Sequence, residues 1–344
     1  MAVPAGCYSL ELCARSKTSV CIAPATTVPV ASMPMTSAPT TAALMTSVTT
    51  TSAPIASAPA ATAPLPLGAA EILVIEGADA IAFAQAQFTS GVAELAQGAW
   101  QWSAWLDAQG RARHFFALLR IDATRLLAWQ PLGDAAGMRA ALARFVFRSK
   151  VALDAPSGWA LHALRSPDLP ASANAREFSV HRDGYALAMP GTTDRIAWLA
   201  PSGTAAVDAD ALAEWRVQDI AARLPLLASA SSGEFVPQAL ELERHDAIRF
   251  DKGCYPGQEV AARLHFRGGN KRRLLRLSIA GAPPAHAAQI IADGSHAAGQ
   301  VLYAAPVSKQ TSEALAVVAD AHAEAANLTT SSGGESVAAS KIDV

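Results

Sequence analysis

Reactive and polar side chains are concentrated between Asp251 and Glu259, where the sequence reads Asp-Lys-Gly-Cys-Tyr-Pro-Gly-Gln-Glu. Cys254 supplies a thiol. Lys252 lies two positions earlier, on the same side of the chain if the segment is extended, and its charge would favour the thiolate. Such a thiol suits a nucleophile, a redox group or a ligand for a soft metal. The commoner alternative for a free cysteine is a small buried hydrophobic side chain.

The neighbours of this cysteine favour a ligand site over simple packing. Tyr255 offers a flat apolar face on which a ring can stack. Gln258 and Glu259 together offer the donors and acceptors that complement an aminopyrimidinone edge, although a solvated helix start would contain the same pair. Gly253 and Gly257 mark turns or allow a close approach of the backbone to a ligand.

The chain has four cysteines, and the other three are Cys7, Cys13 and Cys21. Their spacing matches no CxxC or zinc pattern, and three of the four lie in a segment with the composition of disorder. We therefore expect a reducing compartment, no disulfide framework and no resident metal site. A single cysteine without a partner cannot make an internal disulfide or a closed zinc site.

The composition places broad limits on the protein. The chain has 344 residues, of which 51% are hydrophobic and 16% charged, with a net charge of -2. This predicts one large domain or two to three small ones, and no overall attraction to nucleic acid or anionic membranes. No apolar run is long enough to span a membrane, and no secretory signal is evident. We expect a cytoplasmic protein, with an organelle transit peptide as the alternative.

The hydrophobic pattern predicts an α+β protein. Residues 1–68 are rich in Ala, Thr, Ser and Pro and are expected to be disordered, with an over-extended start or a mucin-like stalk as alternatives. Strands are expected near 72–75, 100–105, 115–120, 126–130, 160–164, 178–181, 185–189 and 196–199. Helices are expected after Asp79 as N-cap, across 138–146, and across 212–224 up to Pro225. Short strands near 274–279, 289–291, 300–303 and 315–318 predict a small antiparallel barrel.

One basic run follows the cysteine segment. It consists of His265, Arg267, Lys271, Arg272, Arg273 and Arg276. A solvated strand face is the commoner explanation, and phosphate, RNA or the glutamate tail of a cofactor are the functional alternatives. The sequence contains neither a glycine-rich phosphate loop nor a nucleophile elbow.

The run Lys252-Gly253-Cys254-Tyr255-x-Gly257-Gln258-Glu259 resembles the signature of the YgfZ family of folate-binding proteins, which are relatives of the glycine-cleavage T-protein. Further matching motifs are Gly77-x-Asp79-Ala80 through Gln87-x-Thr89, Arg148–Val151, Phe235-x-Pro237-Gln238, Ala261-Ala262-Arg263, Lys271–Leu274 and Gly299–Leu302. The resemblance extends from about residue 71 to about residue 320.

The resemblance implies a fold and a domain organisation. Subdomains form a ring-like arrangement around a central folate pocket, and the last is a small antiparallel β-barrel. On this basis residues 1–68 are the disordered tail, 69–268 a folate-binding α+β core of two intertwined subdomains, 269–324 the barrel and 325–344 a flexible tail. The implied cofactor is tetrahydrofolate or a one-carbon derivative.

The resemblance also implies a function. The family supports iron–sulfur cluster assembly or repair, including the enzyme that methylthiolates tRNA, and Cys254 would be its reactive (catalytic) residue. The implied cofactor-binding residues are Lys252, Gly253, Tyr255, Gly257, Gln258, Glu259 and Arg263. The expected partners are folate and iron–sulfur proteins or their assembly machinery, with a transient cluster as an option. Direct binding of nucleic acid or membrane is not expected.

Two departures from the related families restrict this reading. T-proteins have an acidic pair after the turn that matches Asp107–Gly110, and this chain has Arg113 and His114 there. Glycine cleavage is therefore not expected, and whether the protein is an enzyme stays open. The family often has Asn at the position of Glu241. The alternatives are a folate-dependent aminomethyl transferase and an RNA- or protein-binding module that uses the basic run 263–276.

Overall fold

The computed structural model of the protein describes residues 63–165, 176–192, 194–201 and 206–342. The expected disorder of residues 1–62, with the three early cysteines, lies outside the described residues. Residues 65–68, which the sequence assigned to the same tail, belong instead to strand β1, Leu65–Ala69. The described chain contains two five-stranded antiparallel sheets and a closed barrel.

The first sheet has the strand order β3-β4-β5-β2-β6. Its strands are β2 (Glu71–Glu76), β3 (Trp100–Leu106), β4 (Ala112–Arg120), β5 (Arg125–Gln130) and β6 (Ala152–Asp154). Successive residues of a strand face opposite sides, so Ile72 joins one hydrophobic core and Leu73 another. Helices α1 (Ala80–Gln87) and α2 (Ala135–Leu142) cover the Leu73 side, and Phe83 and Met138 pack there. Because both faces of this sheet are buried, a shift of one residue in strand pairing would move every side chain to the wrong core, so the register is fixed.

The second sheet has the order β1-β7-β10-β9-β8. It contains β7 (Ala160–Arg165), β8 (Phe178–His181), β9 (Gly184–Ala188) and β10 (Arg195–Ala200). Strand β1 pairs antiparallel with β7 although it directly precedes β2 of the first sheet in the sequence. The chain therefore passes from one sheet to the other at residue 70, and this exchange ties the two sheets together.

The closed barrel has the order β11-β14-β13-β12-β15-β16. Its strands are β11 (Arg272–Ala280), β12 (Gln289–Ala292), β13 (His296–Pro306), β14 (Thr311–Ala319), β15 (Leu328–Ser332) and β16 (Glu335–Lys341). The last two correct our expectation of a flexible tail from residue 325, because β15 pairs with β12 and β16 with β11 to close the barrel. Their Ser-, Thr- and Ala-rich sequences give little hydrophobic signal, but closure satisfies their backbone groups.

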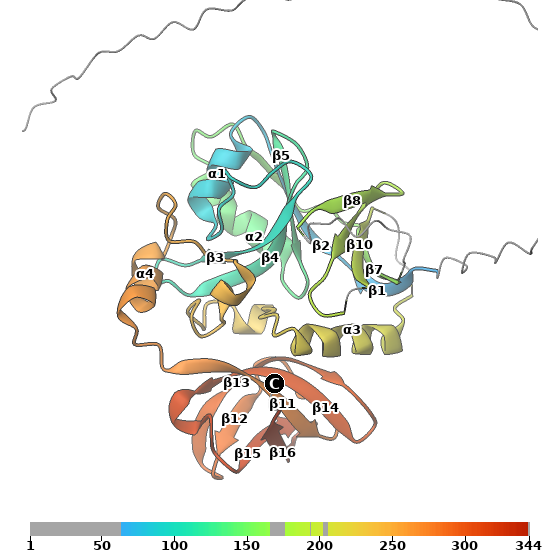
Figure 1. Ribbon diagram of the computed structural model, residues 1–344, viewed down its shortest axis with the longest axis vertical. Helices are drawn as coiled ribbons and strands as arrows, with labels where there is room; N and C mark the ends of the chain where they lie inside the picture. The colour runs from blue at the N-terminus through green and yellow to red at the C-terminus, as the bar shows by residue number, and fades with distance from the viewer. Residues whose placement is uncertain (1–62, 166–175, 193, 202–205, 343–344) are drawn as a thin grey trace, which may run out of the picture. The chain divides into compact units, whose positions relative to one another are not determined.

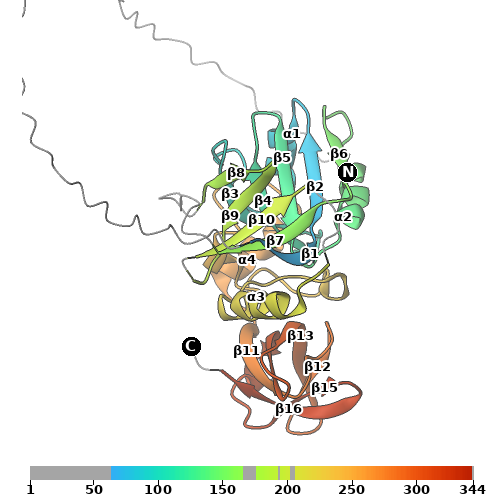
Figure 2. The same cartoon turned by 90° about the vertical axis from the view of Figure 1, so that its right-hand side faces the viewer.

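Helix α3 (Ala209–Ala221) lies between the second sheet and the barrel (Figure 1 and Figure 2). Its N-cap Asp208 accepts a hydrogen bond from the backbone N–H of Ala211 at 2.9 Å. On the barrel side, the buried hydroxyl of Tyr303 donates to the carbonyl of Leu224 at 2.8 Å. Side chains of both sheets, α3 and the barrel share one hydrophobic core. The predicted α+β class with a C-terminal antiparallel barrel is confirmed.

Most of the predicted elements are present with shifted ends. The remaining helical elements are α4 (Gln258–Arg267) and the 3₁₀ turns Ala143–Phe145, Ser229–Ser231, Leu242–His245 and Asp320–His322. The predicted capping role of Asp79 was wrong in detail. Its carboxylate makes no cap bond and instead accepts from the backbone N–H of Lys150 at 2.7 Å. Strands β1 and β6, which are short, were not predicted.

Candidate functional site

The thiol of Cys254 is free and exposed. It lies on the short loop between the 3₁₀ turn Leu242–His245 and α4, with Gly253 beside it in open space. The alternative of a cysteine packed among aliphatic side chains does not apply. The sulfur is available to a reactant or a partner in solution, as a nucleophile or soft ligand requires.

Lys252 anchors this loop to the first sheet. Its ammonium donates to the backbone carbonyls of Phe88 and Ser90, each at 2.6 Å, on the segment that follows α1. Burial lowers the pKa of Lys252 to about 8. The ammonium also lies 5.3 Å from the centre of the Tyr255 ring. The cation that the sequence assigned to the thiol is thus used to hold the loop in place.

Tyr255 supports the loop from the protein side. Only 6% of its surface is exposed, and its ring belongs to the shared hydrophobic core. Its hydroxyl donates to the carbonyl of Arg249 at 3.0 Å, and burial raises the pKa of this phenol. Arg249 in turn pairs with Asp251 at 2.7 Å. The ring therefore packs beneath the loop and presents no open face for a stacked ligand.

The other predicted site residues lie at the start of α4. Gly257 is the N-cap and has a left-handed backbone, with φ of 75°. Gln258 is half-buried, whereas Glu259 and Arg263 are exposed on the helix. Lys252 and Tyr255 contact each other, but none of the predicted site residues lines the cavities described below. The motif builds a rigid platform for Cys254.

A cavity of about 340 Å³ lies between the two sheets, and we call it the inter-sheet cavity. Its lining residues are Trp100, Trp102, Arg176, Ala188, Met189, Pro190, Arg244 and His245. They come from β3, from the residues before β8, from the end of β9 and the segment after it, and from the 3₁₀ turn Leu242–His245. Sequence reasoning did not find this site. The available signal was the pair of tryptophans two positions apart, on one face of a predicted strand.

The polar groups of the inter-sheet cavity suit an anionic heterocyclic ligand. The indole N–H groups of Trp100 and Trp102 are buried without a recorded acceptor, which is uncommon for a native donor. Two guanidinium groups, those of Arg176 and Arg244, line it, and each pairs with a carboxylate outside the lining, Asp246 and Glu241 respectively. His245 bonds the Arg223 carbonyl through Nε2 at 3.0 Å, so Nε2 carries the proton and Nδ1 is an acceptor. Burial lowers the pKa of His245 and so favours the neutral ring.

A second, more open cavity of about 430 Å³ adjoins the cysteine loop. It is lined by Glu243, Asp246, Ile248, Arg249, Phe250, Asp251, His265 and Phe266. The rings of Phe250 and His265 stack with 4.3 Å between centres, and Phe266 is 73% exposed. Its carboxylates are engaged by neighbouring side chains, since Asp251 pairs with Arg249 and Glu243 lies 2.9 Å from Nδ1 of His265. This cavity carries little unbalanced charge.

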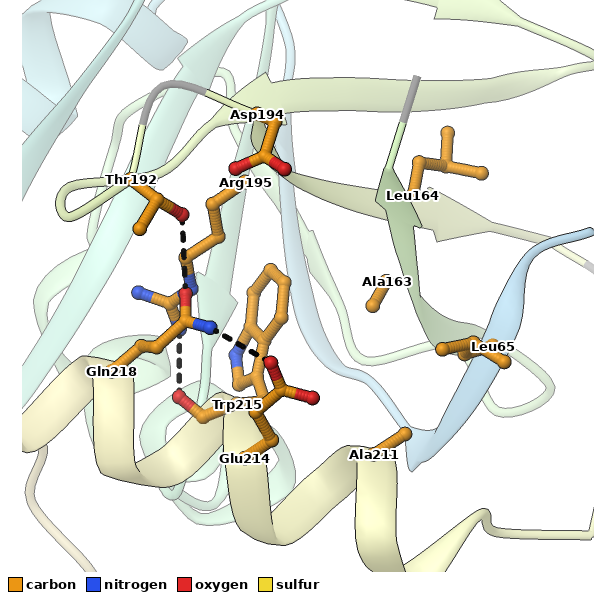
Figure 3. A pocket seen from close by; sticks show the side chains of 10 residues that line it. All are labelled: Leu65, Ala163, Leu164, Thr192, Asp194, Arg195, Ala211, Glu214, Trp215 and Gln218. Atoms are coloured by element: carbon orange, nitrogen blue, oxygen red, sulfur yellow. Dashed lines mark hydrogen bonds between the residues drawn. The ribbon is translucent and has the colours of Figure 1, made fainter. Parts of the chain in front are cut away.

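A third cavity, of about 150 Å³, separates the second sheet from α3 (Figure 3). Arg195 and Trp215 form its inner wall, with the guanidinium carbon 4.0 Å from the centre of the indole. Arg195 is buried and pairs with buried Asp219, which also pairs with Arg216 at 3.0 Å. The buried ions thus pair with one another, so this network secures α3 against the sheet.

The positions that depart from the related families also have a structural explanation. His114 is buried and bonds Gln130 through Nδ1 at 2.7 Å, and burial lowers its pKa to about 4. Arg113 is exposed and lies over the Trp105 ring at 5.4 Å. Neither side chain supplies a carboxylate. Glu241 has a left-handed backbone, with φ of 52°, a conformation for which Asn is enriched.

The basic run begins in α4 and continues into β11, and its arginines Arg273 and Arg276 are ion-paired. Arg273 bonds Asp320 at 2.8 Å, and Arg276 forms a two-pronged pair with Glu313. Both arginines belong to β11 of the barrel. The solvated strand face that we considered the commoner explanation therefore accounts for the part of the run that lies in β11.

The described residues contain neither an evident metal centre nor a membrane-spanning helix. Among them, no group of three or more His, Cys, Asp or Glu side chains is arranged to hold a metal ion. Within the same ranges, no helix is long and apolar enough to cross a membrane.

Comparison with solved structures identifies the fold. The fold is similar to that of the glycine cleavage system aminomethyltransferase T from Bartonella henselae, with a TM-score of 0.58, 19% identity, and coverage of 82% of this chain and 85% of that one. The fold is thus that of the T-protein class. No family model matches the chain.

Sequence relatives then identify the family. The tRNA-modifying protein YgfZ of Klebsiella pneumoniae is 32% identical over 230 residues, which cover 60% of this chain and 68% of that protein. The protein of the same name from Serratia proteamaculans is 52% identical over 61 residues, 18% of each chain. The chain belongs to the YgfZ family. This confirms the assignment made from the cysteine motif, and the protein has a YgfZ-type role.

Proposed function

We propose that the protein binds tetrahydrofolate and supports the assembly or repair of iron–sulfur proteins, including those that methylthiolate tRNA, through the thiol of Cys254. The observation that carries this proposal is an exposed thiol on a loop that is fixed on both sides. Lys252 anchors the loop on one side, and Gly257 packs against the Asp107–Gly110 turn on the other. A fixed thiol is held ready for a partner without the cost of ordering a mobile loop.

The inter-sheet cavity is where we propose that folate binds. At about 340 Å³ it falls within the usual range for small-molecule sites. The residues fit the group: the tryptophan N–H groups would donate to ring acceptors, and Nδ1 of His245 would accept from a ring N–H. Arg176 and Arg244 would bind the glutamate carboxylates in exchange for their present partners, Asp246 and Glu241. When bound, tetrahydrofolate supplies a carrier for one-carbon groups.

The function of Cys254 is tested with Cys254→Ala and Cys254→Ser. Because the side chain is exposed, both variants should unfold within about 0.5 kcal/mol of wild type. Both should fail to restore the activity of an iron–sulfur enzyme in a strain lacking the protein. Gly253→Ala, next to the thiol and free of contacts, is the matched control and should restore it. Full restoration by Cys254→Ala would remove the thiol from the function.

The folate site is tested separately by calorimetry with tetrahydrofolate and its one-carbon forms. Arg244→Ala and Trp102→Phe should each weaken binding, because one removes a cation and the other a donor. Lys271→Ala is the control. Lys271 precedes β11 of the barrel and does not line the inter-sheet cavity, so this variant should bind folate as the wild type does. Unchanged binding by both cavity variants would place folate elsewhere, including at the predicted residues Gln258, Glu259 and Arg263.

The competing aminomethyl transferase finds little support at the expected position. His114 is buried and neutral, and Arg113 is cationic, so neither can hold an amine donor as a carboxylate does. Incubation of the protein with tetrahydrofolate and an aminomethyl donor should give no methylene-tetrahydrofolate. Formation of that product would favour the transferase.

A further inference from the structure

The segment after α2 combines cations and exposed aromatic rings in a way that the proposed function leaves unexplained. Residues 135–153 contain four cations, Arg139, Arg144, Arg148 and Lys150, and no acidic residue. The whole chain has a net charge of -2, so this is a strong local excess of positive charge. We call Arg144, Phe145, Phe147, Arg148 and Lys150 the basic aromatic segment.

The two aromatic rings of this segment reach the surface to different extents. Phe147 is 87% exposed, the highest value among the large hydrophobic side chains of the described residues, and Phe145 is 39% exposed. Phe147 also has a left-handed backbone, with φ of 41°. A bulky residue in this conformation is strained, and strain of this kind is concentrated at binding sites. Packing does not explain why a large ring is held in water.

The cations of the segment are available as well. Arg144, Arg148 and Lys150 are exposed, and no ion pair joins them to another described residue. This distinguishes them from Arg273 and Arg276 of the barrel, which are paired with carboxylates. Unpaired cations can release counterions when they bind phosphates, and this release drives association with nucleic acids.

The basic aromatic segment packs against the β-hairpin that supports the cysteine loop. Phe145 contacts the Trp105 ring edge-on at 6.0 Å, and Arg113 lies over the same ring at 5.4 Å. Trp105 is in β3, whose turn at Asp107–Gly110 carries Gly257 at the start of α4. The segment therefore packs against the same hairpin that supports the Cys254 loop.

We propose that the basic aromatic segment binds single-stranded RNA, with Phe147 and Phe145 stacking on bases and Arg144, Arg148 and Lys150 contacting phosphates. Unpaired bases expose the flat faces that such rings require, whereas a duplex hides them. This inference goes beyond the proposed function, because neither folate nor the thiol of Cys254 takes part in it. The net charge of the whole chain predicted no attraction to nucleic acid. The proposal revises this expectation, because the cations of the segment are concentrated locally.

The test is fluorescence anisotropy of a short labelled single-stranded RNA of mixed sequence with the full-length protein at low salt. Phe147→Ala should weaken binding about tenfold, and Phe147→Trp should restore it. Arg144→Glu with Arg148→Glu should abolish measurable binding. Arg144→Ala with Arg148→Ala should lower the dependence of log K on log salt by about 1.4, at about 0.7 per phosphate contact. Because these side chains are exposed, the variants should fold, which circular dichroism checks.

The matched control is Lys271→Glu with Arg272→Glu, the same charge change in the other basic run. It should keep the affinity within about twofold of wild type, since only local cations contact the RNA. Equal losses in both double mutants, equal affinity for duplex and single strand, or no binding by the wild type would overturn the proposal. A loss of iron–sulfur enzyme rescue without any RNA binding would also overturn it and assign the segment to a protein partner.

Discussion

Gly257 and Gly110 pack backbone against backbone. A Cβ atom placed on Gly257 would lie 2.7 Å from the Gly110 Cα and 2.4 Å from the Asp107 carbonyl oxygen. Both glycines also have left-handed backbones, with φ of 75° and 76°. The hairpin turn and the start of α4 can approach this closely because neither residue has a side chain.

This contact predicts a large effect of Gly257→Ala. The added methyl group clashes with backbone atoms that cannot rotate away, and alanine is strained at this φ. We expect a loss of about 2–4 kcal/mol in the free energy of unfolding. Urea denaturation measures it. Gly253→Ala is the control in the same loop, and it should change stability by less than about 0.5 kcal/mol because nothing lies within 4 Å of its Cβ position. Equal stability of the two variants would show that the close contact does not hold the loop.

The anchoring role of Lys252 predicts a second effect. Lys252→Met keeps the aliphatic stem but leaves the carbonyls of Phe88 and Ser90 without their donor. We expect a loss of about 2–4 kcal/mol at pH 7 and faster alkylation of Cys254 as the loop becomes mobile. Iodoacetamide labelling followed by mass spectrometry measures the second effect. An unchanged labelling rate would mean that the glycine contact alone fixes the thiol.

Lys252 should also make stability depend on pH. Burial lowers its pKa from 10.5 to about 8, so between these values the unfolded state binds more protons than the folded state. Stability therefore gains a contribution that rises with pH across this window. The free energy of unfolding of the wild type, measured relative to that of Lys252→Met, should increase from pH 8 to pH 10. A difference that is constant over this range would contradict the lowered pKa.

The sequence predicted the cysteine motif correctly as a unit but not the internal use of its side chains. Lys252 bonds carbonyls at Phe88 and Ser90, more than 160 residues earlier in the chain. No local pattern reports such a contact, because spacing along one segment says nothing about which distant backbone it meets. The side chains of the motif were therefore predicted to bind a ligand, whereas in the structure Lys252 and Tyr255 support the loop.

The inter-sheet cavity was missed for a related reason. Trp102 and His245 line the same cavity and are far apart in the sequence, so only the folded chain brings them together. The barrel strands β15 and β16 were missed because their residues are small and polar. Their order comes from backbone pairing with β12 and β11, to which hydrophobic periodicity is insensitive. Long strands with alternating large residues, such as β3, were predicted well.

His114 provides a prediction at acid pH. Burial lowers its pKa from 6.5 to about 4. Between pH 6.5 and pH 4, His114 is therefore protonated in the unfolded chain but not in the folded one. The stability contribution is complete above pH 6.5 and is lost as the pH falls toward 4, by about 3 kcal/mol in total. In His114→Asn this part of the acid loss should be absent, as thermal unfolding from pH 7 to pH 4 would show. Parallel curves for the two proteins would mean that His114 does not resist protonation.

Tyr303 links the barrel to the segment after α3, and its hydroxyl group can be removed selectively. Tyr303→Phe keeps the buried ring but leaves the Leu224 carbonyl without its donor at a fully buried position. We expect a loss of about 1–2 kcal/mol. Tyr255→Phe removes the corresponding bond to the Arg249 carbonyl beneath the cysteine loop and serves as a matched comparison. Tyr303→Phe should leave the alkylation rate of Cys254 unchanged, whereas Tyr255→Phe should raise it, because only the second bond holds the loop. If both variants raised the rate equally, the barrel and the loop would open together, and the thiol would report on the stability of the whole core instead of its own anchor.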